Sequence, residues 1–214
     1  FFIFCLILLI FMNKLTLPIL FLVTIITSCS TPITTYNNSY VPYPAPDSNL
    51  SQIDGKILVV MDVQDEFRTI ESSPSSFTGG AATAVFAVGK ITKEITLLTY
   101  SRLFTEGSDF SNNFIKGYVV TVTPSIAYFD YKFDQLSSLG MAVTPRVEVN
   151  LLLNIRDSSG KSIFTQTYYS GDTAGSTYMF SASPFEEVNE ALHKAIHNVV
   201  SQSKSDLLKY ANKN

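Results

Sequence analysis

Two kinds of residue in this 214-residue sequence suggest chemistry, because a thiolate or an imidazole can act as a nucleophile, a base or a metal ligand. Cys29 stands where the longest apolar region ends, in the segment TIITSCS, and Cys5 lies inside that region. His193 and His197 stand four residues apart. The sequence after Cys29 has no cysteine, which excludes a disulfide framework, a cysteine-ligated zinc ion and a thiol nucleophile there.

The histidine pair has the i, i+4 spacing of a two-histidine metal site, with Glu190 one turn earlier. However, the segment HKAIH lacks the glutamate of the H-E-x-x-H pattern of zinc proteases. At about 100° per residue, His197 points about 130° away from the centre of the apolar side of the predicted helix. We therefore predict that His193 and His197 face solvent, that these three candidates for metal ligands do not form a metal site, and that the protein needs no cofactor.

Two further patterns suggest a site without completing one. The segment 158–162, SSGKS, resembles the end of a phosphate-binding loop, but Ile155 occupies the position of the required first glycine. Asp62, Asp65 and Glu66 follow a predicted strand and could hold a cation or an arginine of a partner, although a solvated strand end is the simpler interpretation. Nucleophile-elbow and dinucleotide-binding motifs are missing from the sequence. We predict that the protein is not an enzyme.

An apolar leader precedes Cys29. Read from Met12, it has Lys14 near its start, the apolar run LTLPILFLVTII and small residues before the cysteine, which is the pattern of a secretory signal. Residues 1–28 are then the signal peptide, and residues 1–11 lie upstream of the true start at Met12. The alternative is a transmembrane anchor, because both apolar stretches together exceed the roughly 20 residues needed to span a bilayer. The position of Lys14 between the two stretches argues against this anchor.

The end of the leader resembles the bacterial lipobox. Ile26, Thr27 and Ser28 supply the aliphatic residue and the two small residues, and Cys29 is the cysteine that would be acylated, with palmitate among its chains, and become the mature N-terminus. Ser30 replaces the aspartate that would imply inner-membrane retention, so the resemblance implies the periplasmic face of the outer membrane. The bilayer is then a partner, and each buried CH₂ group of the anchor contributes about 0.8 kcal/mol.

The segment 29–52 has the composition of a flexible tether. Its prolines are Pro32, Pro42, Pro44 and Pro46, and it has no charge before Asp47. A solvated tether would lift the following domain away from the membrane. The alternative is an N-terminal arm that packs on its own domain through Tyr36, Tyr40 and Tyr43.

Residues 53–214 are predicted to form a single α+β domain. In order, we expect strands at 56–63 and 82–88 with a loop at 64–80 between them, a helix at 90–106, and two strands at 117–124 and 125–135. The last two are separated at Pro124, which marks a bend or an edge of the sheet. A hairpin follows, with strands at 146–156 and 161–170 joined by a turn at 157–160. In its first strand Val147, Val149, Leu151, Leu153 and Ile155 share one face.

The last predicted helix begins at the N-cap Ser183 and runs to about residue 210. Its apolar stripe consists of Val188, Leu192, Ala195, Ile196, Val199 and Leu207. The expected fold is a mostly antiparallel sheet of about four to five strands, packed by two helices that include this long C-terminal one. A net charge of −3 without a dense basic run argues against nucleic acid as a partner.

In its order of elements, the region 29–210 resembles the outer-membrane lipoproteins of the YajG type and, more distantly, the periplasmic domains of CsgG-like and PelC-like export lipoproteins. This resemblance implies a non-enzymatic part in envelope assembly or export, often as a homo-oligomeric ring. The predicted function is therefore an accessory module that binds other envelope proteins or itself. One alternative is a carrier of a small ligand or lipid, and another is a hydrolase with an unrecognised site.

Overall fold

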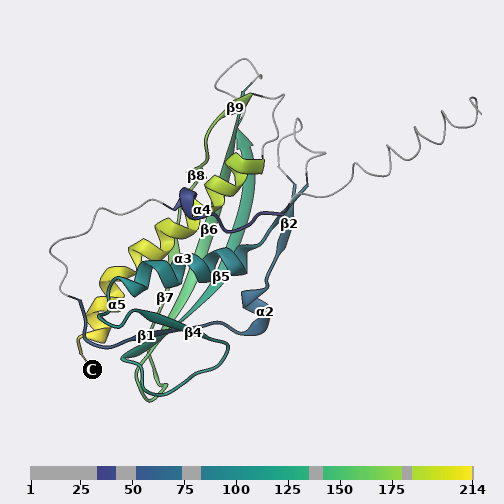
Figure 1. Ribbon diagram of the computed structural model, residues 1–214. Coiled ribbons are helices and arrows are strands. Elements are labelled where there is room, and N and C mark those ends of the chain that lie inside the picture. The colour runs from purple at the N-terminus through teal and green to yellow at the C-terminus, as the bar shows by residue number, and fades with distance from the viewer. Residues whose placement is uncertain (1–32, 42–51, 74–82, 135–141, 180–184, 214) are drawn as a thin grey trace, which may run out of the picture. The chain divides into compact units, whose positions relative to one another are not determined.

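The computed structural model describes residues 33–41, 52–73, 83–134, 142–179 and 185–213 (Figure 1). They belong to one compact unit, which begins at Ile33. The predicted signal peptide, the lipobox with Cys29, Tyr43 and the helix N-cap Ser183 lie outside the described residues. Among the helices of the described residues, none combines the length and the hydropathy that a membrane-spanning helix requires.

Seven strands of the described residues form one mixed sheet, with the order β4-β1-β5-β6-β7 and with the short strands β8 and β9 added beside β6. The strands are β1 (Ile57–Val60), β4 (Ser108–Ser111), β5 (Val120–Asp134), β6 (Ala142–Arg156), β7 (Ser162–Tyr169), β8 (Thr173–Ala174) and β9 (Tyr178–Met179). β1 runs parallel to both β4 and β5, whereas β5, β6 and β7 are antiparallel. The α+β prediction is confirmed, but the sheet is larger and less antiparallel than expected, because a helical crossover returns the chain beside β1 in the same direction.

The predicted interruption at Pro124 is wrong, because β5 continues through it for 15 residues. Pro124 stands opposite Leu153 of β6. The Ser170 N–H donates to the Val149 oxygen, so the backbone groups of Val149 point toward β7. Because backbone groups point to opposite sides at successive residues of a strand, those of Leu153 also point toward β7. The side of Pro124 that lacks an N–H therefore faces β1, whose pairing with β5 has already ended at Val122. The proline removes no ladder bond because it lies at a local edge of the sheet, which is the edge position that the sequence also suggested.

Two long helices cover one face of the sheet. α3 (Val88–Ser101) and α4 (Phe185–Gln202) pack against each other, and α4 lies across β6 (Figure 1). The inward residues of β6 and the apolar stripe of the last helix are all buried, as predicted: Val147, Val149, Leu151, Leu153, Ile155, Val188, Leu192, Ala195, Ile196, Val199 and Leu207. The helical segment is broken at buried Ser203, and α5 (Lys204–Ala211) follows. The Ser203 hydroxyl bonds to the Val200 oxygen at 2.6 Å and the Tyr100 hydroxyl at 2.5 Å.

The segment 64–80, expected to be a loop, contains part of the helical turn α2 (Val63–Glu66) and the strand β2 (Ile70–Ser72). β2 pairs with β3 (Ala84–Phe86) in a two-stranded sheet. The backbone of α2 packs on the beginning of α3 at Gly89, where a Cβ atom would lie 2.0 Å from the Asp65 oxygen. The predicted hairpin turn is confirmed, with the Gly160 N–H bonded to the Asp157 oxygen at 2.9 Å and Gly160 at a φ of 90°.

Candidate functional site

His193 is fully buried on α4, so the prediction that it faces solvent is wrong. The helical periodicity accounted only for the side of α4 that packs on the sheet. The side that carries His193 is covered by the segment 33–41, which contains the short 3-10 helix η1 (Asn38–Tyr40). His197 is half-buried, and its Nε2 lies 3.3 Å from the Ser201 hydroxyl.

Both ring nitrogens of His193 are hydrogen-bonded. Nδ1 lies 2.7 Å from the carbonyl oxygen of Asn189, which can only accept, so Nδ1 carries the proton. Nε2 then accepts the backbone N–H of Asn37 at 2.9 Å. The rings of Tyr36 and Tyr40 lie with their centroids 5.7 Å and 5.6 Å from that of the imidazole. Burial lowers the pKa of His193, which favours the neutral ring that this arrangement requires.

The segment 33–41, which we call the arm, is held by several further bonds. Thr34 is fully buried, its N–H donates to the Val85 oxygen at 2.8 Å, and its Oγ1 accepts the Ala87 N–H at 2.8 Å. The Asn189 side-chain amide donates to the Thr35 oxygen at 2.9 Å. For these residues the flexible tether predicted over 29–52 is wrong, and the alternative of an arm packed through Tyr36 and Tyr40 is what the structure shows.

The three candidates for metal ligands are not brought together. Both nitrogens of His193 are used by the backbone, and Glu190 binds the Lys194 amino group at 2.7 Å and the Ser176 N–H at 2.9 Å. Within the part of the chain that the structure describes, no group of three or more His, Cys, Asp or Glu side chains is arranged to hold a metal ion.

The acidic cluster after β1 is divided between two structural roles. Asp62 caps α2 by accepting the Asp65 N–H at 2.7 Å. Glu66 is buried instead of solvated, and its carboxylate binds the Lys93 amino group at 2.7 Å and the Asn112 amide at 2.9 Å. These hydrogen bonds, first that from Lys93, lower the pKa of Glu66. Both carboxylate oxygens are therefore occupied by protein donors.

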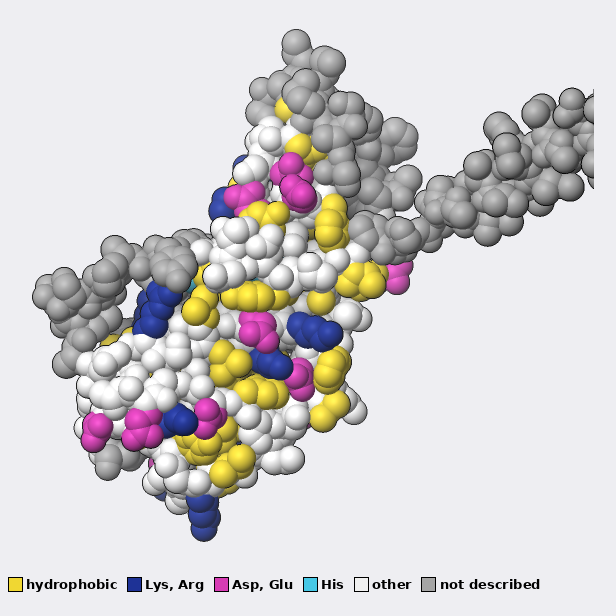
Figure 2. Space-filling model, viewed as in Figure 1, with side chains coloured by type: hydrophobic (Ala, Val, Ile, Leu, Met, Phe, Trp, Pro, Cys, Tyr) yellow, Lys and Arg dark blue, Asp and Glu magenta, His cyan; other side chains and the backbone are white. Residues whose placement is uncertain are grey.

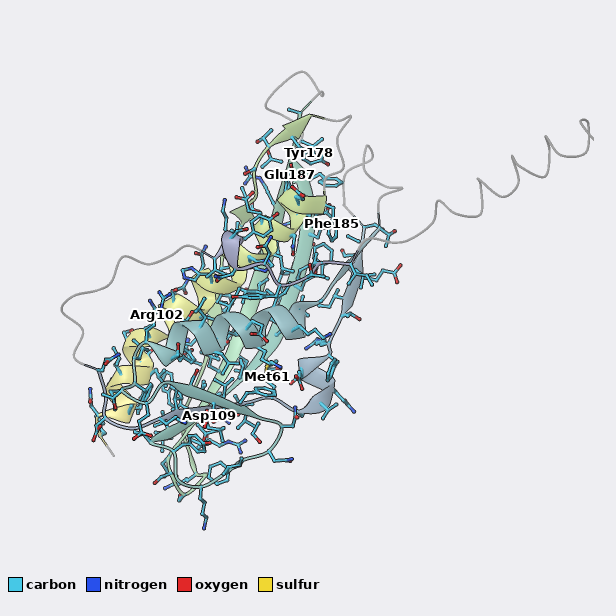
Figure 3. All side chains as sticks on the ribbon, viewed as in Figure 1. Met61, Arg102, Asp109, Tyr178, Phe185 and Glu187 are labelled. Atoms are coloured by element: carbon cyan, nitrogen blue, oxygen red, sulfur yellow. The ribbon has the colours of Figure 1, made fainter. Side chains whose placement is uncertain are left out.

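Other titratable groups also sit in structural surroundings. Asp109 accepts the Tyr118 hydroxyl at 2.8 Å and lies 3.2 Å from the Lys56 amino group, and its pKa is lowered chiefly by the bond from Tyr118. Burial, with a smaller effect of Glu187, raises the pKa of Tyr178 to about 12, so the phenol stays neutral. Tyr178 and Glu187 lie near the beginning of α4, far from Asp109 (Figure 3). These groups do not form one reactive cluster.

The outward face of the sheet carries an exposed apolar group across three strands. Tyr128 of β5, Asn150 of β6 and Tyr169 of β7 stand in register. Tyr128 is 45% exposed and Tyr169 is 59% exposed, and Leu152, the next outward residue of β6, is 38% exposed. The Asn150 side-chain oxygen is buried beneath this group and has no hydrogen-bond partner among the described residues. We call these four residues the open-face patch.

Sequence reasoning missed the open-face patch, although one signal was present. Leu152 is the apolar residue on the otherwise polar face of the β6 pattern, alongside Glu148, Asn150, Asn154 and Arg156. On the helical side of the molecule, by contrast, hydrophobic and charged side chains are mixed (Figure 2).

The open-face patch borders an unprotected sheet edge. β7 has no charged residue and no proline over Ser162–Tyr169, whereas edge strands are commonly protected by both. Because Ser170 directs its N–H at the Val149 oxygen of β6, every second residue of β7 also faces β6. The residues between them, Thr165, Thr167 and Tyr169, turn their backbone groups away from β6. The Tyr169 oxygen accepts a bond from the Gln202 side chain at 3.0 Å. The N–H groups along this edge are placed to pair with another extended segment.

No known family model matches the chain, and no curated protein does. A crystal structure of a Xanthomonas campestris protein of the family DUF330 is similar, with a TM-score of 0.53, 12% identity and coverage of 86% of this chain and 98% of that one. A minor lipoprotein from Acinetobacter baumannii gives a TM-score of 0.35 and 12% identity, over 74% of this chain and 94% of that one. At this identity, the first likeness shows that the chain shares the α+β fold of the Xanthomonas protein.

Proposed function

We propose that the protein is a bacterial lipoprotein, acylated on Cys29 and held at the periplasmic face of the outer membrane. Its domain acts as a non-enzymatic accessory module of envelope assembly or export that binds another envelope protein or a second copy of itself. The lipobox Ile26 to Cys29 supports the anchor. The open-face patch supports the binding role.

The open-face patch carries this proposal because exposed aromatic and aliphatic side chains grouped on a sheet face are typical of protein interaction sites. Tyrosine is enriched among the residues that contribute most to binding, since its ring buries a large area at a small entropic cost. Tyr128 and Tyr169 flank Asn150 in register, so the two exposed rings lie on the same face of three neighbouring strands. The adjacent β7 edge offers backbone groups that pair with an added strand.

The described residues give less support to the two alternatives. Between β6 and α4 the facing side chains, among them Leu151, Leu153, Leu192 and Ile196, belong to one continuous core, where a carrier would need a cavity. Among the same residues, the side chains of His193, Glu66 and Glu190 are bound to structural partners and do not converge on a common cleft.

The anchor is tested by Cys29→Ala in the native bacterium. The variant should lose radiolabelled palmitate and leave the membrane fraction, whereas Ser30→Ala should behave as the wild type. Tight membrane association of Cys29→Ala would contradict the anchor and favour the transmembrane alternative.

The binding role is tested by affinity purification from detergent-solubilised membranes. Leu152→Asp and Tyr169→Asp place a charge in the open-face patch, and Ser158→Asp, in the exposed hairpin turn, is the matched control. We expect the wild type and Ser158→Asp to retain the same stoichiometric partner or second copy, and both patch variants to lose it. Recovery of only the monomer with the wild type would contradict the proposal.

A further inference from the structure

We propose that the arm fastens the domain closely to the bilayer and makes the side that carries β2 and β3 its membrane-facing surface. This inference rests on the proposed lipidation of Cys29. It goes beyond the anchor, because a lipid alone fixes neither the height nor the orientation of a domain.

Only a short length of chain separates the anchor from the first docked residue. Ile33 stands four residues after Cys29, and it already forms a bridge with Val85 of β3. Four residues span at most about 14 Å when fully extended. If the arm were free, the first fixed residue would be Ile53, which bridges to Phe104, and the chain between would reach about 80 Å. Docking of the arm therefore shortens the reach of the anchor by a factor of about six.

The arm is attached to the domain at two independent places. At its beginning, Thr34 bonds to the backbone of Val85 and Ala87, beside β3. Further along, Asn37 bonds to His193 and Thr35 to Asn189, both on α4. At the end of the arm Val41 is buried, with 5% of its surface exposed. Attachment to a strand and a helix fixes the direction of the arm as well as its position.

Docking of the arm brings the surface around β2 and β3 to the membrane. Phe86 of β3 packs on Phe129 and Tyr131 of β5, with ring centroids 4.7 Å and 5.0 Å away. The β6–β7 turn follows Arg156, which pairs with Thr121 at the other end of β5. The separation from residue 121 to residue 130 corresponds to about 30 Å along a strand. In Figure 1, β2 lies along one side of the unit, between β9 at one end and β1 and β4 at the other.

The surface around the arm entry is suited to a position next to lipid. Ile33, the first described residue of the arm, is 55% exposed, and it lies beside Val85, which pairs with exposed Glu71 of β2. An isolated aliphatic side chain at this place can rest at the bilayer interface. Glu71, beside the arm entry, and Ser159, in the distant β6–β7 turn, are thus two exposed reporter positions.

The experiment couples residues 29–214 through the Cys29 thiol to a maleimide lipid in phosphatidylethanolamine and phosphatidylglycerol vesicles. No other cysteine competes, because the sequence after Cys29 has none. A donor dye is attached to an azido amino acid at position 71 or 159, and short-range acceptor dyes are placed on lipid headgroups. We expect energy transfer at least twofold higher from position 71 than from position 159. Equal transfer, or higher transfer from position 159, would overturn the inference.

His193→Ala removes the bond to Asn37, and His197→Ala, one turn along the same helix, is the matched control. Because Thr34 still holds the beginning of the arm on β3, we expect the difference between positions 71 and 159 to decrease in His193→Ala and to be unchanged in His197→Ala. Replacement of residues 33–41 by a Gly-Ser segment of equal length removes both attachments and should abolish the difference. A difference that survives release of the arm would overturn the inference. Chemical coupling keeps this outcome separate from natural acylation, which Cys29→Ala tests.

Discussion

The backbone N–H of Asn37 donates to Nε2 of His193 at 2.9 Å, although the two residues stand 156 positions apart in the chain. The bond joins the arm to α4 and requires a neutral imidazole whose Nδ1 donates to the Asn189 oxygen. A protonated ring would carry a hydrogen on Nε2 and could not accept the Asn37 N–H. Docking of the arm is therefore linked to the protonation state of one buried side chain.

This linkage predicts a loss of stability in mild acid. Burial lowers the pKa of His193 in the folded protein, so the unfolded chain binds the proton more readily. Its contribution to the free energy of unfolding is complete above the unfolded pKa of about 6.5 and is lost as the pH falls from there through the lower folded pKa. Urea unfolding at a series of pH values should show this loss. Burial also lowers the pKa of His197. The loss of stability in acid should therefore be smaller in His193→Gln and smaller still in the double variant with His197→Gln. An unchanged pH profile in His193→Gln would contradict the assignment.

Gly89→Ala should destabilise the protein, although alanine normally stabilises a helix by about 1 kcal/mol relative to glycine. The new Cβ atom would lie 2.0 Å from the Asp65 oxygen and 2.5 Å from the Glu66 oxygen, so α2 must move away from α3. We expect a decrease of about 2 kcal/mol or more in the free energy of unfolding, typical of overpacking. Lys90→Ala, at the next and exposed helical position, is the control and should change stability by less than about 0.5 kcal/mol. Equal or higher stability of Gly89→Ala would refute this packing.

The Glu66–Lys93 pair should behave as a buried ion pair. Lys93→Met leaves the carboxylate of Glu66 buried with only the Asn112 amide as a donor, so we expect the free energy of unfolding to fall by about 3 kcal/mol. Glu66→Gln with Lys93→Met removes both charges and should be less destabilising than Lys93→Met alone. Thermal unfolding of the two single variants and the double variant measures the coupling. Strictly additive effects would show that the two side chains do not interact.

Proline should have different effects at β7 residues whose N–H points toward β6 and at those whose N–H points outward. Gln166 pairs with Leu153 and directs its N–H at β6, so Gln166→Pro should cost about 3 kcal/mol by removing a ladder bond. Thr167 directs its N–H outward, so Thr167→Pro should cost about 1 kcal/mol or less while blocking strand addition at this edge. Chemical unfolding and the oligomeric state by light scattering measure the two effects. Similar destabilisation by both prolines would mean that the assigned alternation is wrong.

Much of the fold could be predicted from local patterns. The alternation of Val147 to Ile155 gave the buried face of β6, and the stripe from Val188 to Leu207 gave the buried side of the last helical segment, because burial against one neighbour leaves a regular period. Pro124 misled the prediction because its effect depends on which side of the strand lacks a neighbour. That property belongs to the sheet order and leaves no mark in the local sequence.

The candidate site depended still more on distant contacts. His193 is buried by an arm that lies more than 150 residues earlier, so a helical projection of α4 alone placed it in solvent. The open-face patch required the register of three strands, since Tyr128, Asn150 and Tyr169 come from separate segments. Leu152 alone departed from the polar pattern of its face, and one exposed leucine is common on protein surfaces.

The central claim is that the domain acts by binding a protein through the open-face patch. The most direct test is photo-cross-linking in living cells of the native bacterium, with benzoylphenylalanine placed at Leu152 or, as the control, at Ser159. We predict a discrete cross-linked species from position 152 that is absent from position 159 and that disappears in the Cys29→Ala background. The same pattern of cross-links from both positions, or no adduct from position 152 in the correctly localised protein, would contradict the claim.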